Sequence, residues 1–174
     1  MTSKATILNH VNLEIGTSTH FPMLIKAMQS SDSAIAELGS GLFSTPLIHW
    51  FDFENKRLRI TYESYPHYYQ FAREFASDNH KIVFVSDWST LKLEEHYSVV
   101  LIDHSIPRRK HTRGDDAIRF ANIADYVILH DAGSNPDPKY GYENAYKHFR
   151  YRMDWDKEYP HTTVLSNFKT LLDL

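Results

Sequence analysis

The stretch from residue 34 to residue 50 constrains the fold more than any other part of the sequence. An apolar run, 34–38, predicts a buried strand, the glycines around Ser40 predict a tight turn, and Thr45-Pro46 predicts the capped start of a helix. Such a turn exposes backbone N–H groups at a helix N-terminus and admits a ligand close to the main chain. The sequence therefore predicts a strand–turn–helix unit shaped for a nucleotide.

This turn differs from the fingerprint of dinucleotide-binding folds. The third glycine position of Gly-x-Gly-x-x-Gly is Ser44, and an acidic residue, Glu37, precedes the first glycine. A pyrophosphate cradle is therefore not the best fit. The order of the other strands has to identify the ligand.

Length and composition exclude several classes of protein. We expect residues 1–174 to form a single domain, with residues 1–16 as a flexible or extended N-terminal segment. A net charge of -3 disfavours non-specific binding to nucleic acid, and the lack of cysteine excludes disulfides, thiolate metal ligands and a cysteine nucleophile. No signal peptide and no run of about 18 apolar residues is present, which predicts a cytoplasmic protein without a membrane span.

Strand-like runs alternate with helix-like segments along the chain. Strands are expected at 34–38, 57–63, 80–88, 97–105 and 125–131, and helices at 17–29, 45–51, 66–75 and 113–124. A helix at 142–150 and two β-like stretches, 151–156 and 162–168, close the sequence. This order predicts an α/β fold with a doubly wound, Rossmann-like sheet that is mostly parallel and ends in an antiparallel hairpin. The unbroken apolar run 82–85 predicts a strand buried on both faces.

Four of the expected strands end in an acid: Glu63, Asp87, Asp103 and Asp131. Ligands of doubly wound sheets bind beyond the carboxyl ends of the strands, where these side chains would collect. Glu63 follows the glycines at the distance at which a ribose-binding acid is placed, and a carboxylate can accept hydrogen bonds from both ribose hydroxyls. The alternative is that Glu63 caps the helix that begins at Pro66.

These features together resemble the class I S-adenosylmethionine-dependent methyltransferases, from about residue 17 to residue 168. The resemblance implies that Glu37-Leu-Gly-Ser-Gly41 approaches the methionine and ribose of the cofactor, that Glu63 binds the ribose, and that Asp87-Trp88 contacts the adenine. Within that class the chain looks most like the small bacterial and viral enzymes without a separate substrate domain. The full set of implied S-adenosyl-L-methionine-binding residues is His20, Glu37, Gly39, Ser40, Gly41, Ser44, Thr45, Glu63, Asp87, Trp88 and Asp103.

The absence of two sequence features limits the kinds of acceptor that the resemblance allows. The Asn-Pro-Pro-Tyr motif of adenine-N6 methyltransferases is absent, since residues 135–138 read Asn-Pro-Asp-Pro, and the lack of cysteine removes the cytosine-C5 mechanism. An oxygen or simple nitrogen acceptor remains. We predict O-methylation of a small or sugar-like molecule.

An alcohol acceptor needs a base, and two histidines adjoin strand-end acids. The predicted catalytic residues are Asp103, His104, His130 and Asp131, with His104 as the base. Asp103 and Asp131 could instead hold Mg²⁺, but two carboxylates are few for such a cage, so no metal is predicted. The alternative for the histidines is an ordinary core or surface position, since the chain has 11 of them.

The segment Arg108-Arg-Lys-His-Thr-Arg113 is basic. Arg108, Arg109 and Arg113 are predicted to bind an anionic substrate group, such as a nucleotide-sugar phosphate, and the alternative is a solvated loop. Two other functions stay open: an NAD-dependent oxidoreductase on the same fold, and a non-catalytic domain that binds a nucleotide or S-adenosylmethionine. Ser44 and the terminal hairpin argue against the first, and the polar residues at the strand ends argue against the second.

Overall fold

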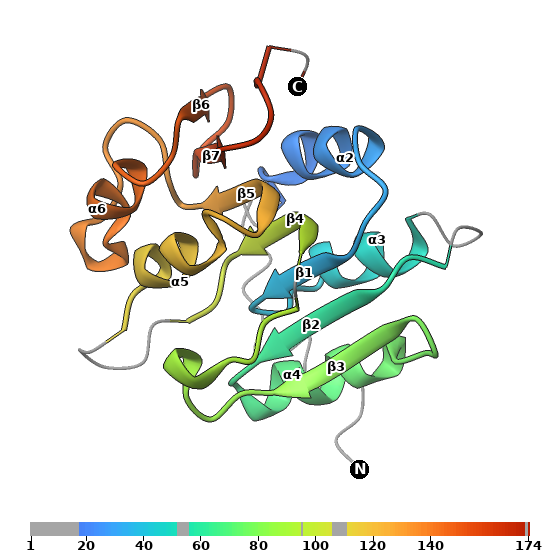
Figure 1. Ribbon diagram of the computed structural model, residues 1–174. Coiled ribbons are helices and arrows are strands. Elements are labelled where there is room, and N and C mark those ends of the chain that lie inside the picture. The colour runs from blue at the N-terminus through green and yellow to red at the C-terminus, as the bar shows by residue number, and fades with distance from the viewer. Residues whose placement is uncertain (1–17, 52–55, 95, 106–110, 173) are drawn as a thin grey trace.

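The computed structural model describes residues 18–51, 56–94, 96–105, 111–172 and 174. Seven strands form one sheet in the order β3-β2-β1-β4-β5-β7-β6 (Figure 1). The strands are β1 (Ile35–Leu38), β2 (Arg59–Glu63), β3 (His80–Phe84), β4 (Tyr97–Ile102), β5 (Ala124–His130), β6 (Tyr151–Trp155) and β7 (Thr162–Ser166). Strands β1 to β5 pair in parallel, and β7 pairs antiparallel with both β5 and β6. The predicted doubly wound sheet with a terminal antiparallel hairpin is confirmed.

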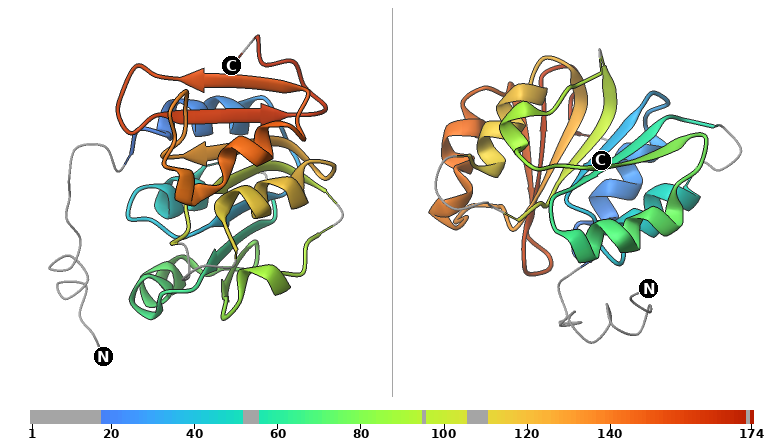
Figure 2. Two further views of the ribbon diagram at one scale, coloured as in Figure 1. Left: turned by 90° about the vertical axis from the view of Figure 1, so that its left-hand side faces the viewer. Right: turned by 90° about the horizontal axis from the view of Figure 1, so that it is seen from below.

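Helices cover both faces of the sheet (Figure 2). One face carries α2 (Phe21–Gln29), α3 (Ser44–Trp50) and α4 (Pro66–Ala72), which continues as the 3₁₀ turn η2 (Arg73–Phe75). The other carries α5 (Arg113–Phe120) and α6 (Tyr142–Tyr146), with the 3₁₀ turns η3 (Trp88–Thr90) and η4 (Pro138–Tyr140) in the connections. Among the described helices, none combines the length and the apolar character that crossing a membrane requires.

Alternate residues of the central strands build two separate cores. In β4, Val99 and Leu101 pack with Met23, Leu24 and their neighbours on α2. Val100 and Ile102 point the other way and pack with Ala117 and Phe120 of α5. The central strands are therefore buried on both faces, which holds their carboxyl ends in a fixed arrangement.

Strand β3 departs from the expected burial on both faces, and that prediction is wrong. Val83 is 36% exposed and Phe84 is 46% exposed. The physical reason is that β3 is the edge strand and that only the short turn η3 occurs in the connection to β4. A strand without a covering helix on one side stays open to solvent there.

Several boundaries also differ from the expectation: α2 begins at Phe21 instead of residue 17, α5 ends at Phe120 instead of residue 124, and β3 ends at Phe84 instead of residue 88. Helix α6 ends at Tyr146 instead of residue 150, and α3 begins at Ser44 with Phe43 at the capping position. Thr45 therefore does not cap α3. Its hydroxyl is used inside the glycine turn, where it accepts a hydrogen bond from the N–H of Gly41 at 3.1 Å.

Candidate functional site

The glycine turn after β1 packs directly on the segment that follows β4. Gly39 has a φ of 91°, and a Cβ placed on it would lie 2.4 Å from the Cα of His104. Only glycine has no Cβ and readily adopts this backbone conformation. Gly39 is therefore required for the close approach of the two strand ends.

The carboxylate of Glu63 holds this turn at the end of β2. Its Oε2 accepts hydrogen bonds from the N–H of Ser40 at 2.8 Å and from the Ser40 hydroxyl at 2.9 Å. Its Oε1 accepts from the N–H groups of Ser64 at 2.7 Å and Tyr65 at 2.6 Å. Glu63 thus joins the glycine turn to the two residues that precede α4, although α4 itself has no side-chain capping hydrogen bond.

Glu37 supports the same turn from inside the protein. The side chain is fully buried, and its Oε2 accepts hydrogen bonds from the hydroxyls of Thr45 at 2.9 Å and Thr61 at 2.7 Å. Burial raises the pKa of Glu37 to about 7, although hydrogen bonds from Ser44, Thr61 and Thr45 oppose the shift. Glu37, Ser44 and Thr45 form an internal polar layer beneath the turn.

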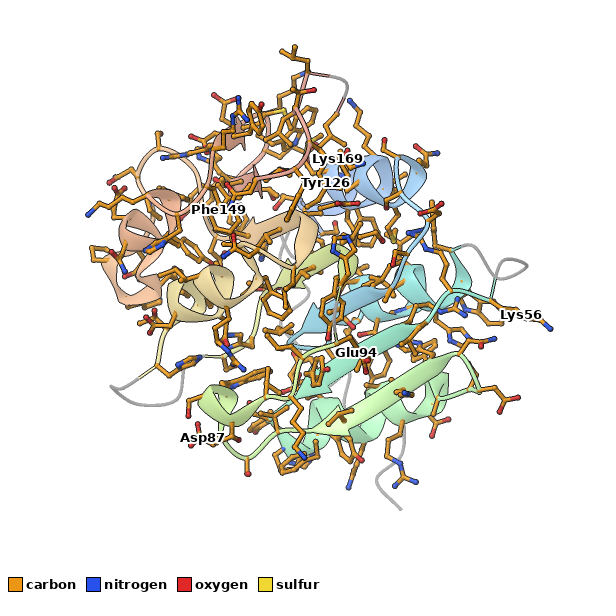
Figure 3. All side chains as sticks on the ribbon, in the orientation of Figure 1. Lys56, Asp87, Glu94, Tyr126, Phe149 and Lys169 are labelled. Atoms are coloured by element: carbon orange, nitrogen blue, oxygen red, sulfur yellow. The ribbon has the colours of Figure 1, made fainter. Side chains whose placement is uncertain are left out.

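Asp87 and Trp88 lie in the connection after β3. Asp87 is at the outer margin of the molecule, beyond the end of β3, and accepts hydrogen bonds from the N–H of Ser89 at 3.0 Å and its hydroxyl at 2.7 Å (Figure 3). Trp88 is 1% exposed and stacks on His104 with a centroid distance of 4.1 Å. A pocket of about 320 Å³ beside β3 includes Asp87, Val83 and Val85, and its described lining contains no other predicted site residue.

Arg113 ties together the ends of β4 and β5. Thr112 and Asp115 form a capping box at the start of α5, which places Arg113 in the first turn. Its guanidinium pairs with Asp103 at 2.9 Å and with Asp131 at 3.1 Å, and it donates to the carbonyl of His104 at 2.7 Å. The sequence predicts substrate binding for this residue, but the structure places its side chain in the interior, 7% exposed. Arg108 and Arg109 lie outside the described residues.

Among the side chains of Asp103, Arg113, His130 and Asp131, the two carboxylates are the most exposed to solvent. The side chains of Asp103 and Asp131 are 27% and 29% exposed. Burial acts to raise the pKa of Asp103, but the charges of Arg113 and His130 outweigh it and hold the pKa well below its ordinary value. Asp131 has a φ of 55°, an uncommon conformation for a residue other than glycine. Such strained residues concentrate at functional sites.

His104 is placed in the core. The residue is fully buried, with Nδ1 at 3.0 Å from the carbonyl oxygen of Ser105 and Nε2 at 2.9 Å from Oδ2 of Asp116. Because both ring nitrogens have protein partners, neither is available to an acceptor in this arrangement. Asp116 is a partner that the sequence analysis missed. Its position in a helical segment gave no sign of a contact with the end of β4.

His130 and His20 lie together beside the carboxylates. Nδ1 of His130 is 3.2 Å from Oδ1 of Asp103 and 3.7 Å from Oδ1 of Asp131. The ring of His20, from the residue before α2, is 4.9 Å from that of His130 between centroids. Burial acts to lower the pKa of His130, yet Asp103 and Asp131 raise it overall. For His20, burial and the nearby His130 lower the pKa to about 4, so it is neutral at pH 7.

The predicted site residues therefore fall into three groups. Gly39, Ser40, Gly41 and Glu63 form the turn, with Glu37, Ser44 and Thr45 beneath it. His20, Asp103, His130 and Asp131 form a second group around Arg113. Asp87 and Trp88 lie in the connection after β3, with Trp88 against the buried His104.

Solved structures share this fold at low sequence identity. A putative O-methyltransferase from Klebsiella pneumoniae is 13% identical with a TM-score of 0.58, over 91% of this chain and 84% of that one. TYW2 from M. jannaschii in complex with AdoMet is 14% identical, with a TM-score of 0.57, over 91% and 78%. A putative RNA methyltransferase from Pyrococcus horikoshii is 12% identical, with a TM-score of 0.54, over 95% and 97%.

No protein-family model and no curated protein sequence matches the chain. At 12% to 14% identity these structures establish the fold, which is that of class I S-adenosylmethionine-dependent methyltransferases. The resemblance inferred from the sequence is confirmed at this level. The fold alone does not determine the reaction, which depends on the residues of the site.

Proposed function

We propose that this protein is an S-adenosylmethionine-dependent methyltransferase. The observation that carries the proposal is the pairing of the glycine turn after β1 with the carboxylate of Glu63 at the end of β2, at 2.8 and 2.9 Å. Both lie at the carboxyl edge of a sheet in which β7 is inserted antiparallel between β5 and β6. Ligands bind at this edge in doubly wound folds. Solved structures of the same fold include complexes with SAH, with AdoMet and with a bound cofactor.

Ser40 explains how Glu63 can bind a ribose. Its hydroxyl donates to Glu63 but also lies 3.2 Å from the carbonyl oxygen of Tyr68, a second acceptor for the same proton. On ligand binding, the Ser40 hydroxyl turns to Tyr68, and a ribose hydroxyl takes its place on the Glu63 carboxylate. The bonds from backbone N–H groups keep the carboxylate in position during this exchange.

The group around Arg113 is the proposed acceptor side. S-adenosylmethionine supplies an electrophilic methyl group on a sulfonium, so the protein mainly has to place the acceptor oxygen in line with it. The acceptor oxygen forms a bond to the methyl carbon, and the carbon–sulfur bond breaks with its electrons staying on sulfur. The hydroxyl proton passes to the polar side chains around Arg113. Asp103, His130 and Asp131 are our choice for orienting and activating the acceptor, because both nitrogens of His104 are paired.

A small or sugar-like alcohol is the acceptor we favour over RNA. The net charge is -3, and Arg113, a member of the basic segment, is used internally to pair two carboxylates. RNA binding relies on exposed cations that neutralise phosphates. An NAD-dependent oxidoreductase is disfavoured because the antiparallel β7 departs from the dinucleotide-binding sheet.

We expect Glu63→Ala to weaken binding of S-adenosylhomocysteine by about 10- to 100-fold. Hydrogen bonds to a charged group are worth about 1.5 to 3 kcal/mol each, and tenfold in affinity corresponds to about 1.4 kcal/mol. Calorimetric titration of the purified chain with S-adenosylhomocysteine measures the change, with NAD as the competing ligand. Preferential binding of NAD by the wild-type protein would reject the proposed cofactor.

Ser40→Ala is the matched control for this prediction. It removes the hydroxyl that competes for Glu63 and leaves the N–H of Ser40 in place, so the affinity should stay the same or increase. Thermal unfolding of both variants shows whether the turn is intact. If folded Glu63→Ala binds as tightly as wild type, Glu63 does not contact the ribose.

Asp103→Asn should lower kcat by about 10²-fold or more while the affinity for S-adenosylhomocysteine changes little. The substitution keeps the shape but removes the charge that faces His130 and Arg113. Turnover is measured as S-adenosylhomocysteine release with panels of small alcohols, nucleotide sugars and RNA. Methylation confined to RNA would overturn the proposed acceptor class, and normal turnover in Asp103→Asn would remove this residue from the reaction.

A further inference from the structure

We propose that His20, Asp103 and His130 bind a divalent transition-metal ion. The three residues come from the start of α2, the end of β4 and the end of β5. One ligand atom from each lies within 4.8 Å of the others. Binding of the ion follows from these contacts alone and does not depend on methyl transfer.

The buried side chain of His20 is the strongest indication that these three residues bind an ion. It is 1% exposed, and neither of its ring nitrogens has a hydrogen-bond partner among the described residues. A buried imidazole without a partner loses the hydrogen bonds that water would provide. A metal ion coordinated by one nitrogen would compensate for that loss.

The hydrogen bonds of His130 determine which of its nitrogens faces the site. The hydroxyl of Thr19 donates its single proton to the carbonyl of Pro160 at 2.6 Å, so it accepts from Nε2 of His130 at 3.1 Å. Nε2 therefore carries hydrogen, and in the neutral ring Nδ1 holds the lone pair toward Asp103. Metal-binding histidines commonly donate the opposite N–H to an oxygen in this way, which fixes the ring and its tautomer.

Nδ1 of His130 and Oδ1 of Asp103 are arranged as neighbouring ligands. They are 3.2 Å apart, but Nδ1 does not meet the geometry of a hydrogen bond. Two ligand atoms at about 2.1 Å from one tetrahedrally coordinated ion would be about 3.4 Å apart. The spacing thus fits two adjacent positions on a metal ion.

The charges around the cluster also favour a cation. Asp103 and Asp131 face His130, and Arg113 pairs with both carboxylates, so these three charged side chains sum to one net negative charge, which an ion can neutralise when it replaces a proton on His130. Arg113 uses one direction at Oδ1 of Asp103, and a carboxylate has about four lone-pair sites. A lone pair of Asp103 therefore remains for an ion.

The ligand set selects the kind of metal. Two imidazoles and one carboxylate suit Zn²⁺ and other first-row transition metals, whereas Mg²⁺ prefers oxygen ligands. Three protein ligands leave a coordination position open, as catalytic sites do. If the proposed function holds, that position would take the acceptor hydroxyl and lower its pKa.

The test uses the full chain after treatment with a chelator. We expect calorimetry to show one Zn²⁺ bound per chain, without displacement by a large excess of Mg²⁺, and Co²⁺ to give the visible absorption of nitrogen–oxygen coordination. His20→Gln and Asp103→Asn should each weaken Zn²⁺ binding by about 100-fold, since the first removes an imidazole and the second removes the negative charge of the carboxylate, and loss of outer-shell partners alone costs about 10- to 100-fold. His148→Ala, which removes an exposed imidazole elsewhere, should leave it unchanged.

Circular dichroism establishes whether each variant is folded. If His20→Gln does not fold, Asp103→Asn, which keeps the side-chain shape, still tests the site. Failure of the wild-type chain to bind Zn²⁺, or equal affinity in the folded ligand variants, would overturn the proposal and leave His130 as a protonated partner of Asp103. Titration of the same samples with S-adenosylhomocysteine separates the two proposals. Zn²⁺ binding without S-adenosylhomocysteine binding would retain the metal site and reject the proposed function.

Discussion

Arg113→Met is expected to lower the free energy of unfolding by about 3 to 5 kcal/mol. The guanidinium is 7% exposed and pairs with Asp103 and Asp131. It also donates to the carbonyl oxygens of Asp103 and His104 at 3.0 and 2.7 Å. Methionine has a similar length but no donors, so it would leave two carboxylates together without the cation between them. Urea or thermal unfolding measures the loss.

Lys139→Met is the matched control, because it also replaces a cation by methionine. The Lys139 side chain is 60% exposed and its partner Asp137 is 46% exposed, so water screens the pair and the stability should hardly change. Equal effects of the two substitutions would contradict a structural role for Arg113. Normal stability of Arg113→Met together with weaker acceptor binding would instead support the substrate-binding role predicted from the sequence.

Gly39→Ala should lower the free energy of unfolding by about 2 to 6 kcal/mol. The backbone conformation, with a φ of 91°, is unfavourable for alanine and contributes about 1 to 3 kcal/mol. The contact of the new Cβ with the Cα of His104, at 2.4 Å, adds overpacking that costs about 1 to 3 kcal/mol. Because the obstacle is backbone, it can move only if the ends of β1 and β4 separate. Equilibrium unfolding checks the value.

Gly41→Ala is the control within the same turn. Its Cβ would meet the hydroxyl oxygen of Ser44 at 2.8 Å, which is the end of a small side chain that can move at the cost of its hydrogen bond to Glu37, so the effect on stability should be smaller than that of Gly39→Ala. If Gly39→Ala unfolds at the same denaturant concentration as wild type, the close approach of the strand ends does not need glycine. A similar loss in both variants would point to a general intolerance of the turn.

Local pattern was sufficient for the elements and their order. The predicted strands 34–38, 57–63 and 97–105 became β1, β2 and β4, because an apolar or alternating segment of that length is typical of a strand. The apolar run 82–85 also belongs to a strand segment, but its strand, β3, lies at the sheet edge. Its exposure depends on which helix covers it, and that is a long-range property.

The partners of the site residues could not be read from local pattern. Asp103 and His104 are adjacent in sequence, yet the side chain of Asp103 meets Arg113 and His130 while that of His104 meets Asp116. Neighbouring residues on an extended segment point in opposite directions, so adjacency to an acid says little about which histidine shares its surroundings. The grouping of His20 with His130 joins residues separated by more than 100 positions.

The sequence by itself determined the alternation of strands and helices, the reversed terminal hairpin, the glycine turn and the positions of the strand-end acids. Each of these follows from side-chain periodicity or from the backbone freedom of glycine, which are properties of a few consecutive residues. Only the tertiary structure decided that Arg113 pairs two carboxylates, that His104 is enclosed, and that His20 faces His130. Those outcomes depend on how strands far apart in the chain align at one edge of the sheet, because burial and charge pairing act between groups that only the fold brings within a few ångströms.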